Sequence, residues 1–195
     1  VVPKLACNDI CALASKTLDK SKFKKAVIPN TLLVHYLQLS YSNRSSPEKL
    51  SQEQHRLLTQ IGLGVRVREA CTLSKAMISP GSDRVWVTGK HDLGRSLTMS
   101  TFVKQHLQHI QSSCTEASYS KWLVQSGIQP NQVRKTFCTI QVQVLGTFKK
   151  IVQVYLRHVS GRTLEEHYLC PLKDLGPLDS VMKVIYCMAL PHIVT

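Results

Sequence analysis

Two pairs of side chains in this sequence have types and spacings that suit a metal ion. Cys7 and Cys11 are one helical turn apart, and so are His106 and His109. Structural zinc normally takes four ligands, often in close pairs of the C-x2-C form. Neither pair has that form, and no spacing joins one pair to the other. We interpret the cysteines as helix core and the histidines as a wet helix face, and we expect no metal and no cofactor.

Catalytic signatures are weaker still. Ser118 precedes Lys121 by three residues, but a serine acylase also needs an oxyanion site and further basic elements. The segment GSDRVWVTGKH resembles a phosphate loop only loosely, because its glycines are too far apart and His91 replaces the hydroxyl residue. Neighbouring Glu165 and Glu166 would point apart on a strand. We therefore predict that the chain is not an enzyme.

The distribution of charge carries the strongest signal. The 48 residues from Ala117 to Leu164 contain seven Lys and Arg and no Asp or Glu. The whole chain has 25 bases against 12 acids, a net charge of +13. Such an excess favours a polyanionic partner, although a basic strand can also be a solvated sheet face. The candidate nucleic-acid-binding residues are Lys121, Arg134, Lys135, Lys149, Lys150, Arg157 and Arg162.

The elements expected around this tract resemble a winged helix-turn-helix in their order between residues 97 and 160. Helical patterns over 96–111, 117–127 and 129–137 precede two alternating segments, 138–144 and 152–157, which predict a β-hairpin. A third strand is expected near Thr163–Cys170. In that geometry the short third helix enters a major groove. It would offer Gln129, Asn131, Gln132, Arg134 and Lys135, with Lys149 and Lys150 beside the phosphates.

The first half of the chain predicts a mixed subdomain. We expect a helix over 8–25, a buried strand over 30–42, and a helix from Ser46-Pro47 to Gly62 and Gly64. A short strand, RVWV, lies between turns. The fold class is therefore α+β, helices with a late antiparallel hairpin. Residues 1–96 and 97–195 form two subdomains, unless the chain is a single domain.

The closing helix, from Asp179 onward, is apolar on two sides. Val181, Val184, Ile185 and Met188 share one stripe, while Met182, Tyr186 and Leu190 share another. A helix packed only against its own domain needs one apolar face. The second stripe is therefore either buried as well or a partner-binding surface.

These patterns together predict a class of function. Seven scattered cysteines favour reduced thiols over a secreted disulfide framework, and no stretch is long and apolar enough to span a membrane. We expect a non-enzymatic, nuclear (or cytoplasmic) interaction module cut from a larger protein. It would engage nucleic acid, DNA rather than RNA, or an acidic protein partner. The alternative is a pure protein–protein adaptor of a multi-subunit complex.

Overall fold

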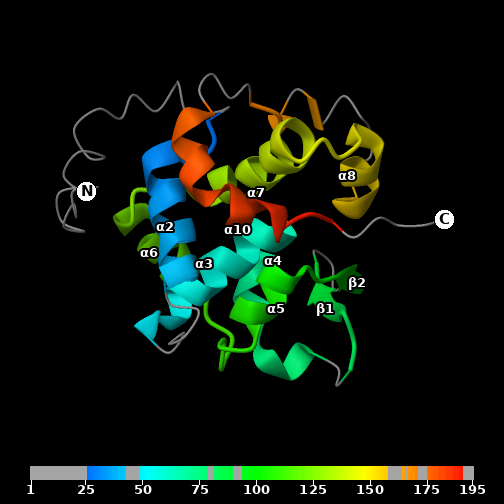
Figure 1. The fold of residues 1–195 in the computed structure, drawn as a ribbon. Helices are drawn as coiled ribbons and strands as arrows, with labels where there is room; N and C mark the ends of the chain where they lie inside the picture. The colour runs from blue at the N-terminus through cyan, green and yellow to red at the C-terminus, as the bar shows by residue number, and fades with distance from the viewer. Residues whose placement is uncertain are drawn as a thin grey trace.

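The structure, a computed structural model, describes residues 26–42, 49–78, 81–89, 94–157, 164–165, 167–170 and 175–190. It is mostly helical with one antiparallel pair of strands, which confirms the α+β class (Figure 1). The helix expected over 8–25, with Cys7 and Cys11, and the candidate Arg162 lie outside the described residues. None of the described helices is long and apolar enough to cross a bilayer.

Helices make up most of the described chain. The main helices are α2 (Asn30–Ser42), α3 (Gln52–Leu63), α4 (Val67–Thr72), α5 (Thr101–Leu107), α6 (Glu116–Gln125), α7 (Pro130–Thr139), α8 (Lys149–Tyr155) and α10 (Met182–Tyr186). Shorter helical turns are η3 (Lys75–Met77), the π-helical η5 (Ile140–Val144) and η6 (Gly176–Val181). The strands are β1 (Arg84–Thr88) and β2 (Gly94–Thr98).

Helix α3 is the centre of the fold. Ser51 caps its start through a capping box with Gln54, five residues later than the expected start at Ser46. The helix ends at Gly64, whose φ of 64° is left-handed, as the sequence predicts. It packs against α5 and α7. Gly62 permits the close approach of α5, because a Cβ there would lie 2.6 Å from Val103 Cγ2.

The strand expected over 30–42 is wrong, because this segment is helix α2. Its buried side chains recur with helical spacing: Leu32, Leu33, Tyr36, Leu37 and Ser40. The density of aliphatic residues suggested a buried strand, but a 13-residue run is long for a strand and ordinary for a helix. In Figure 1, α2 lies at one side of the molecule, where it contacts η6.

The hairpin expected over 138–157 is also wrong. Residues 140–144 form a π-helical turn and residues 149–155 form α8. The alternation of apolar and polar residues predicted strands, but three polar residues assigned to the solvent face are buried: Thr139, Gln141 and Gln153. Gln141 shows why, since its amide donates to the Met188 carbonyl at 2.8 Å. The third strand is wrong as well: Leu164, Glu165 and His167 are helical.

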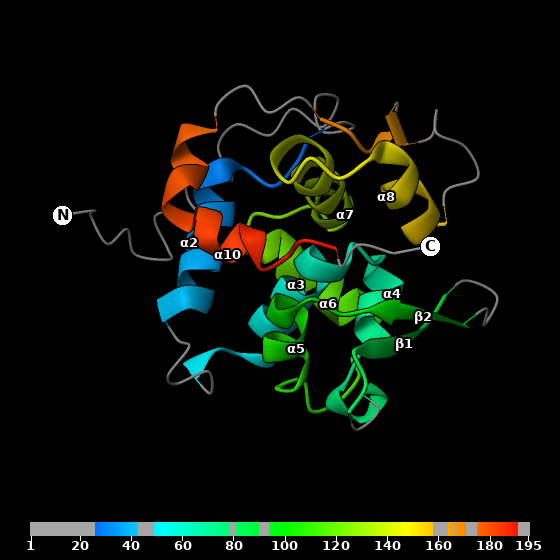
Figure 2. The same ribbon diagram turned by 45° about the vertical axis from the view of Figure 1, so that its right-hand side comes forward.

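The antiparallel hairpin lies earlier, at β1 and β2. RVWV was expected to be a strand and is one, whereas β2 takes the residues expected to begin the next helix. Trp86 pairs with Ser96 and Val87 with Arg95. Val85, Val87, Arg95 and Leu97 point inward. Figure 2 shows the hairpin and α8 on the same side of the molecule. Helix α4 contacts strand β1 as well as helices α3 and α6.

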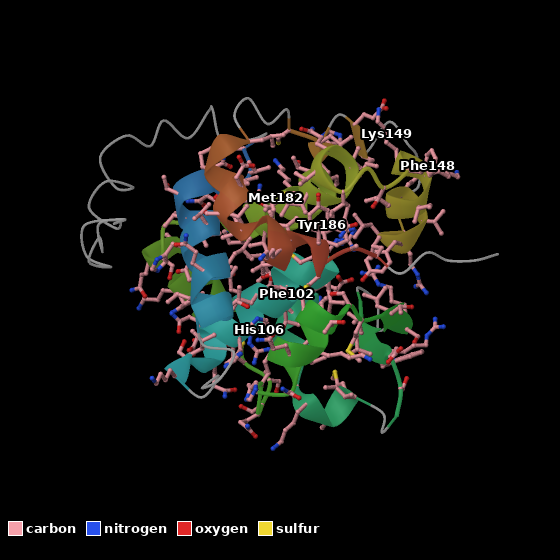
Figure 3. All side chains as sticks on the ribbon, viewed as in Figure 1. Phe102, His106, Phe148, Lys149, Met182 and Tyr186 are labelled. Carbon is pink, nitrogen blue, oxygen red and sulfur yellow. The ribbon has the colours of Figure 1, made fainter. Side chains whose placement is uncertain are left out.

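The closing segment forms η6 and then α10. The first stripe is buried as expected: Val181, Val184, Ile185 and Met188. The second stripe is not uniformly buried, because Tyr186 is 62% exposed while Met182 and Leu190 are half-buried. Figure 3 shows Met182 and Tyr186 on the visible face of this segment. Its use as a partner-binding surface stays a prediction, and so does the division of the chain at residues 96 and 97.

Candidate functional site

Four arginines and one glutamate, from segments far apart in the sequence, converge between α4, β2, α7 and the end of α8. We call this set the arginine cluster: Arg66, Arg95, Arg134, Arg157 and Glu69. Arg66 is the N-cap residue of α4, and its backbone N–H donates to Glu69 Oε2 at 2.7 Å. Arg95 Nη2 donates to the same oxygen at 3.2 Å. Glu69 thus ties β2 to the start of α4.

Arg134 is fixed by backbone carbonyls. Its Nη1 donates to the Gly64 carbonyl at 2.8 Å, and its Nη2 donates to the Leu156 carbonyl at 3.0 Å. The side chain is 4% exposed. These bonds join the end of α3, helix α7 and the residue before Arg157, which has a left-handed φ of 52°. The planar guanidinium is therefore held in one orientation by two separate segments of backbone.

Electrostatics make the cluster unusually positive. Four guanidiniums and one carboxylate give a net charge of +3 (4 − 1). Burial lowers the pKa of Arg95, and the charges of Arg157 and Arg66 lower it further, while Glu69 opposes them. Burial also lowers the pKa of Arg134, and Arg66 adds to this. Both buried arginines stay protonated at neutral pH, whereas the side chains of Arg66 and Arg157 are exposed to solvent, which screens their charge.

Two buried donors at the cluster have no hydrogen-bond partner within the described ranges. They are Arg95 Nε and the Tyr155 hydroxyl. Burial raises the pKa of Tyr155, with the charges of Arg95 and Arg134 acting against it, so the hydroxyl keeps its proton. Buried donors are nearly always satisfied in native proteins. Unused donors among excess positive charge are what an anion-binding site presents before its anion binds.

Tyr168 is the second tyrosine at this site. Its ring lies over Arg134, with 5.5 Å from the guanidinium carbon to the ring centroid. A small core holds Leu164 and α8 against α7: Phe137, Cys138, Val152, Leu156 and Leu164. Tyr155 and Tyr168 both pack on this core. The Tyr168 side chain is half-buried, and the hydroxyl of Tyr155 is buried.

The residues predicted from the basic tract separate into two groups. Arg134 and Arg157 belong to the arginine cluster, and Lys135 is 5% exposed on α7. Lys121, Lys149 and Lys150 are exposed on α6 and α8. Gln132 is buried too, so α7 presents little of the polar face expected of a groove-reading helix. Sequence reasoning missed five residues: Arg66, Glu69, Arg95, Tyr155 and Tyr168.

Replacement of Lys149 and Lys150 tests the prediction that these residues of α8 bind nucleic acid. Lys149 pairs with Glu165 at 2.7 Å, and both side chains are more than half exposed, so the pair adds little stability. Phe148 and Lys149 lie at the outer edge of the molecule (Figure 3). Replacing Lys149 and Lys150 with glutamine should leave the melting temperature nearly unchanged. The slope of log Kd for DNA against the logarithm of the salt concentration should decrease by about one for each phosphate contact that the change removes.

Lys183, which is exposed on α10, is the matched control for this pair. Its replacement with glutamine should change neither the melt nor the salt slope. If the Lys149 and Lys150 double variant keeps the wild-type slope in a fluorescence-anisotropy titration, α8 is not part of the DNA-binding surface.

The histidines considered for metal binding have structural partners instead. His106 is 1% exposed, its Nε2 lies 2.6 Å from Ser40 Oγ, and its Nδ1 lies 3.2 Å from His55 Nδ1. His109 stacks on His55 with 4.8 Å between ring centroids. Within the described residues, no group of three His, Cys, Asp or Glu side chains is arranged to hold a metal ion. The wet helix face expected for His106 is therefore wrong, because this side chain is buried.

Comparison with known proteins identifies the fold. No protein-family model matches the sequence, and a search of curated proteins finds no similar sequence. Among solved structures, the chain resembles a lambda integrase bound to a core site (TM-score 0.55, 12% identity, 83% of this chain and 65% of that chain). It resembles XerA recombinase (0.55, 16%, 88% and 65%). It also resembles the Tn1549 transposon integrase in complex with circular intermediate DNA (0.57, 14%, 86% and 69%).

These likenesses correct one expectation from the sequence. The prediction of a non-enzymatic module is wrong, because the chain has the fold of integrases and recombinases, which are enzymes. The chain spans 65% of the length of the lambda integrase and XerA chains. The arginine cluster and Tyr168 lie between positions 66 and 168, so no short sequence motif contains them.

Proposed function

We propose that this chain is the DNA-strand-cleaving and rejoining part of a recombinase-type enzyme. The arginine cluster binds one phosphodiester of the DNA, and Tyr168 attacks its phosphorus. The observation that carries the proposal is the cluster itself: two buried and two exposed guanidiniums, with unused buried donors, beside the ring of Tyr168. The fold supports it, since two of the similar structures contain integrases with DNA. A nuclear (or cytoplasmic) location remains a prediction from the charge and the cysteine content.

The chemistry follows from these groups. Phosphoryl transfer develops negative charge on the phosphate oxygens, and preorganised arginines stabilise that charge more than water does. Attack by Tyr168 Oη forms a bond to phosphorus while the bond to one deoxyribose oxygen breaks. The tyrosine loses its proton, and the deoxyribose oxygen gains one. The resulting phosphotyrosine link keeps the phosphodiester bond count, so a free deoxyribose hydroxyl reverses the step without a cofactor.

Tyr168, rather than Tyr155, is the proposed nucleophile because the Tyr155 hydroxyl is buried. The Tyr155 hydroxyl is buried and its pKa is raised by burial, which disfavours the phenolate that attack requires. Tyr155 is instead placed to donate a hydrogen bond to a phosphate oxygen. The two tyrosines therefore supply a matched pair of variants, each removing one hydroxyl and leaving the ring in place.

Covalent trapping tests this assignment. The protein is incubated with fluorescent duplexes whose central segment is randomised, and protein–DNA adducts are separated under denaturing conditions. We expect an adduct with the wild type that mass spectrometry maps to Tyr168. Tyr168→Phe should abolish it entirely while retaining noncovalent DNA binding, and Tyr155→Phe should form it more slowly, by about a hundred- to a thousandfold for the removal of one donor. An adduct that persists in Tyr168→Phe would rule out this nucleophile.

A further inference from the structure

Cys71 and Cys114 lie next to each other although 43 positions separate them in the sequence (114 − 71). Cys71 is in the last turn of α4, and Cys114 comes directly before Thr115, the N-cap residue of α6. The Cys114 backbone N–H donates to the Cys71 carbonyl at 3.0 Å. Residues paired by backbone hydrogen bonds across two segments have Cα atoms about 5.5 Å apart. Disulfides bridge Cα separations of about 4.4 to 6.8 Å, so a bond between these two sulfurs requires little backbone movement.

A buried arginine holds the two cysteine segments together. Arg56 of α3 is 2% exposed, and its Nη1 donates to the Ala70 carbonyl at 2.6 Å and to the Cys71 carbonyl at 3.3 Å. Its Nη2 donates to the Ser112 carbonyl at 2.5 Å. One planar guanidinium therefore fixes the end of α4 against the segment that leads to Cys114. The approach of the two cysteines is built into the core and does not depend on a surface loop alone.

The two thiols interact directly and differ in exposure. Both are free; Cys114 is exposed, whereas Cys71 is 4% exposed. Burial raises the pKa of Cys71 to about 12, and the charge of Cys114 and a hydrogen bond with its thiol add to this rise, while the charge of Arg56 opposes it. Cys71 therefore keeps its proton at neutral pH, and an oxidant that arrives from solvent meets Cys114 first. An exposed thiol with a second thiol beside it is typical of reversible cysteine oxidation.

We propose that Cys71 and Cys114 form a reversible oxidation site, in which a peroxide converts the two thiols into a disulfide. The Cys114 thiolate attacks one peroxide oxygen, the O–O bond breaks, and the sulfur becomes a sulfenic acid while water leaves. The Cys71 sulfur then attacks the Cys114 sulfur: the S–S bond forms, the S–O bond breaks, and the oxygen leaves as water with the Cys71 proton. Two thiols and one peroxide thus give one disulfide and two waters, and an external dithiol reduces the disulfide again.

The disulfide would stabilise a defined part of the chain. The loop that it closes contains both strands and α5, and therefore Arg95 of the arginine cluster. A cross-link over a loop of this length restricts the unfolded chain and should raise the melting temperature by about 5 to 15 °C. The site does not depend on the proposed function, because neither its chemistry nor this effect involves DNA.

Peptide mapping tests the site. The reduced protein is treated with an equimolar amount of hydrogen peroxide, the remaining thiols are alkylated, and the protein is digested with trypsin without reduction. We expect a linked pair of peptides, residues 69–75 and 105–121, which dithiothreitol separates. Cys114→Ser should abolish both this pair and the rise in melting temperature. Cys187→Ser, which removes a half-buried thiol at the end of α10, is the matched control and should retain both.

A second variant separates the two steps. In Cys71→Ala the sulfenic acid on Cys114 has no thiol beside it, so dimedone should label Cys114 in this variant and label it much less in the wild type. The inference fails if Cys114 of the wild type is still fully alkylated after peroxide treatment, or if it is linked to a cysteine other than Cys71. Because Cys114 is exposed, Cys114→Ser keeps the test valid even if Cys71→Ala does not fold.

Discussion

Gly64→Ala should lower the free energy of unfolding by about 2 to 5 kcal/mol, from two separate causes. An alanine held at the left-handed φ of 64° costs about 1 to 2 kcal/mol. The added Cβ would also lie 2.2 Å from Phe137 Cδ1, and such overpacking costs about 1 to 3 kcal/mol. For a chain of this length the melting temperature should fall by about 4 to 20 °C in thermal denaturation followed by circular dichroism.

Gly146 provides a matched control for this change. Its φ of 66° is nearly the same, but an added Cβ there would meet nothing within 4 Å. Gly146→Ala should therefore show only the backbone cost, and the difference between the two variants isolates the contact with Phe137. Equal melting temperatures would show that Phe137 can move aside freely. Because the Gly64 carbonyl accepts from Arg134, Gly64→Ala should also weaken phosphate binding, whereas Gly146→Ala should not.

The second large effect is a decrease of stability in acid, centred on His106. Burial lowers its pKa to about 3, with the neighbouring His55 and His109 adding to the shift. In the unfolded chain the pKa is near 6.5. Between those values the unfolded state binds a proton that the folded state excludes. Stability is therefore full above pH 6.5 and decreases by about 1.4 kcal/mol per pH unit as the pH falls from 6.5 toward 3.

Replacement of His106 with glutamine should reduce the slope of the unfolding free energy against pH by the amount that corresponds to one proton, because glutamine does not titrate. Glutamine also retains a polar partner for Ser40. Urea denaturation at half-unit intervals from pH 7 to pH 4 measures the slope for both proteins. The groups facing His106 are Ser40, the Phe102 ring and the two histidines His55 and His109, so carboxylates elsewhere contribute equally to wild type and variant. Parallel curves for the two proteins would place the acid sensitivity at another group.

Local signals predicted local structure well. A left-handed glycine, Gly64, marks the end of α3, and an alternating run marks the strand that contains RVWV. Helices α6 and α7 were also predicted from residues close in sequence, including the Pro near the start of α7. The errors arose where tertiary contacts reverse the local pattern. Thr139, Gln141 and Gln153 look like solvent-facing strand residues, yet the fold buries them through hydrogen bonds or packing.

The site was predictable only in part, because its members are brought together by the fold. Arg134 and Arg157 lie in the acid-free tract, so charge counting found them. Arg66 and Glu69 lie in a segment of mixed pattern, and Arg95 lies in a strand that was expected to begin a helix. Nothing in the sequence next to Tyr168 marks it as the neighbour of Arg134. Tyr168 is a candidate only because its ring contacts the guanidinium of Arg134, which lies 34 positions earlier in the sequence (168 − 134).

The arginine cluster joins four segments that are otherwise independent along the chain: the start of α4, strand β2, helix α7 and the end of α8. An anion that binds only the assembled cluster must oppose the local opening of every one of them. The stabilisation is RT ln(1 + [L]/Kd), shared by all four segments. Amide hydrogen exchange in these segments would then slow together on binding, so that the ligand converts separate local fluctuations into one cooperative unit.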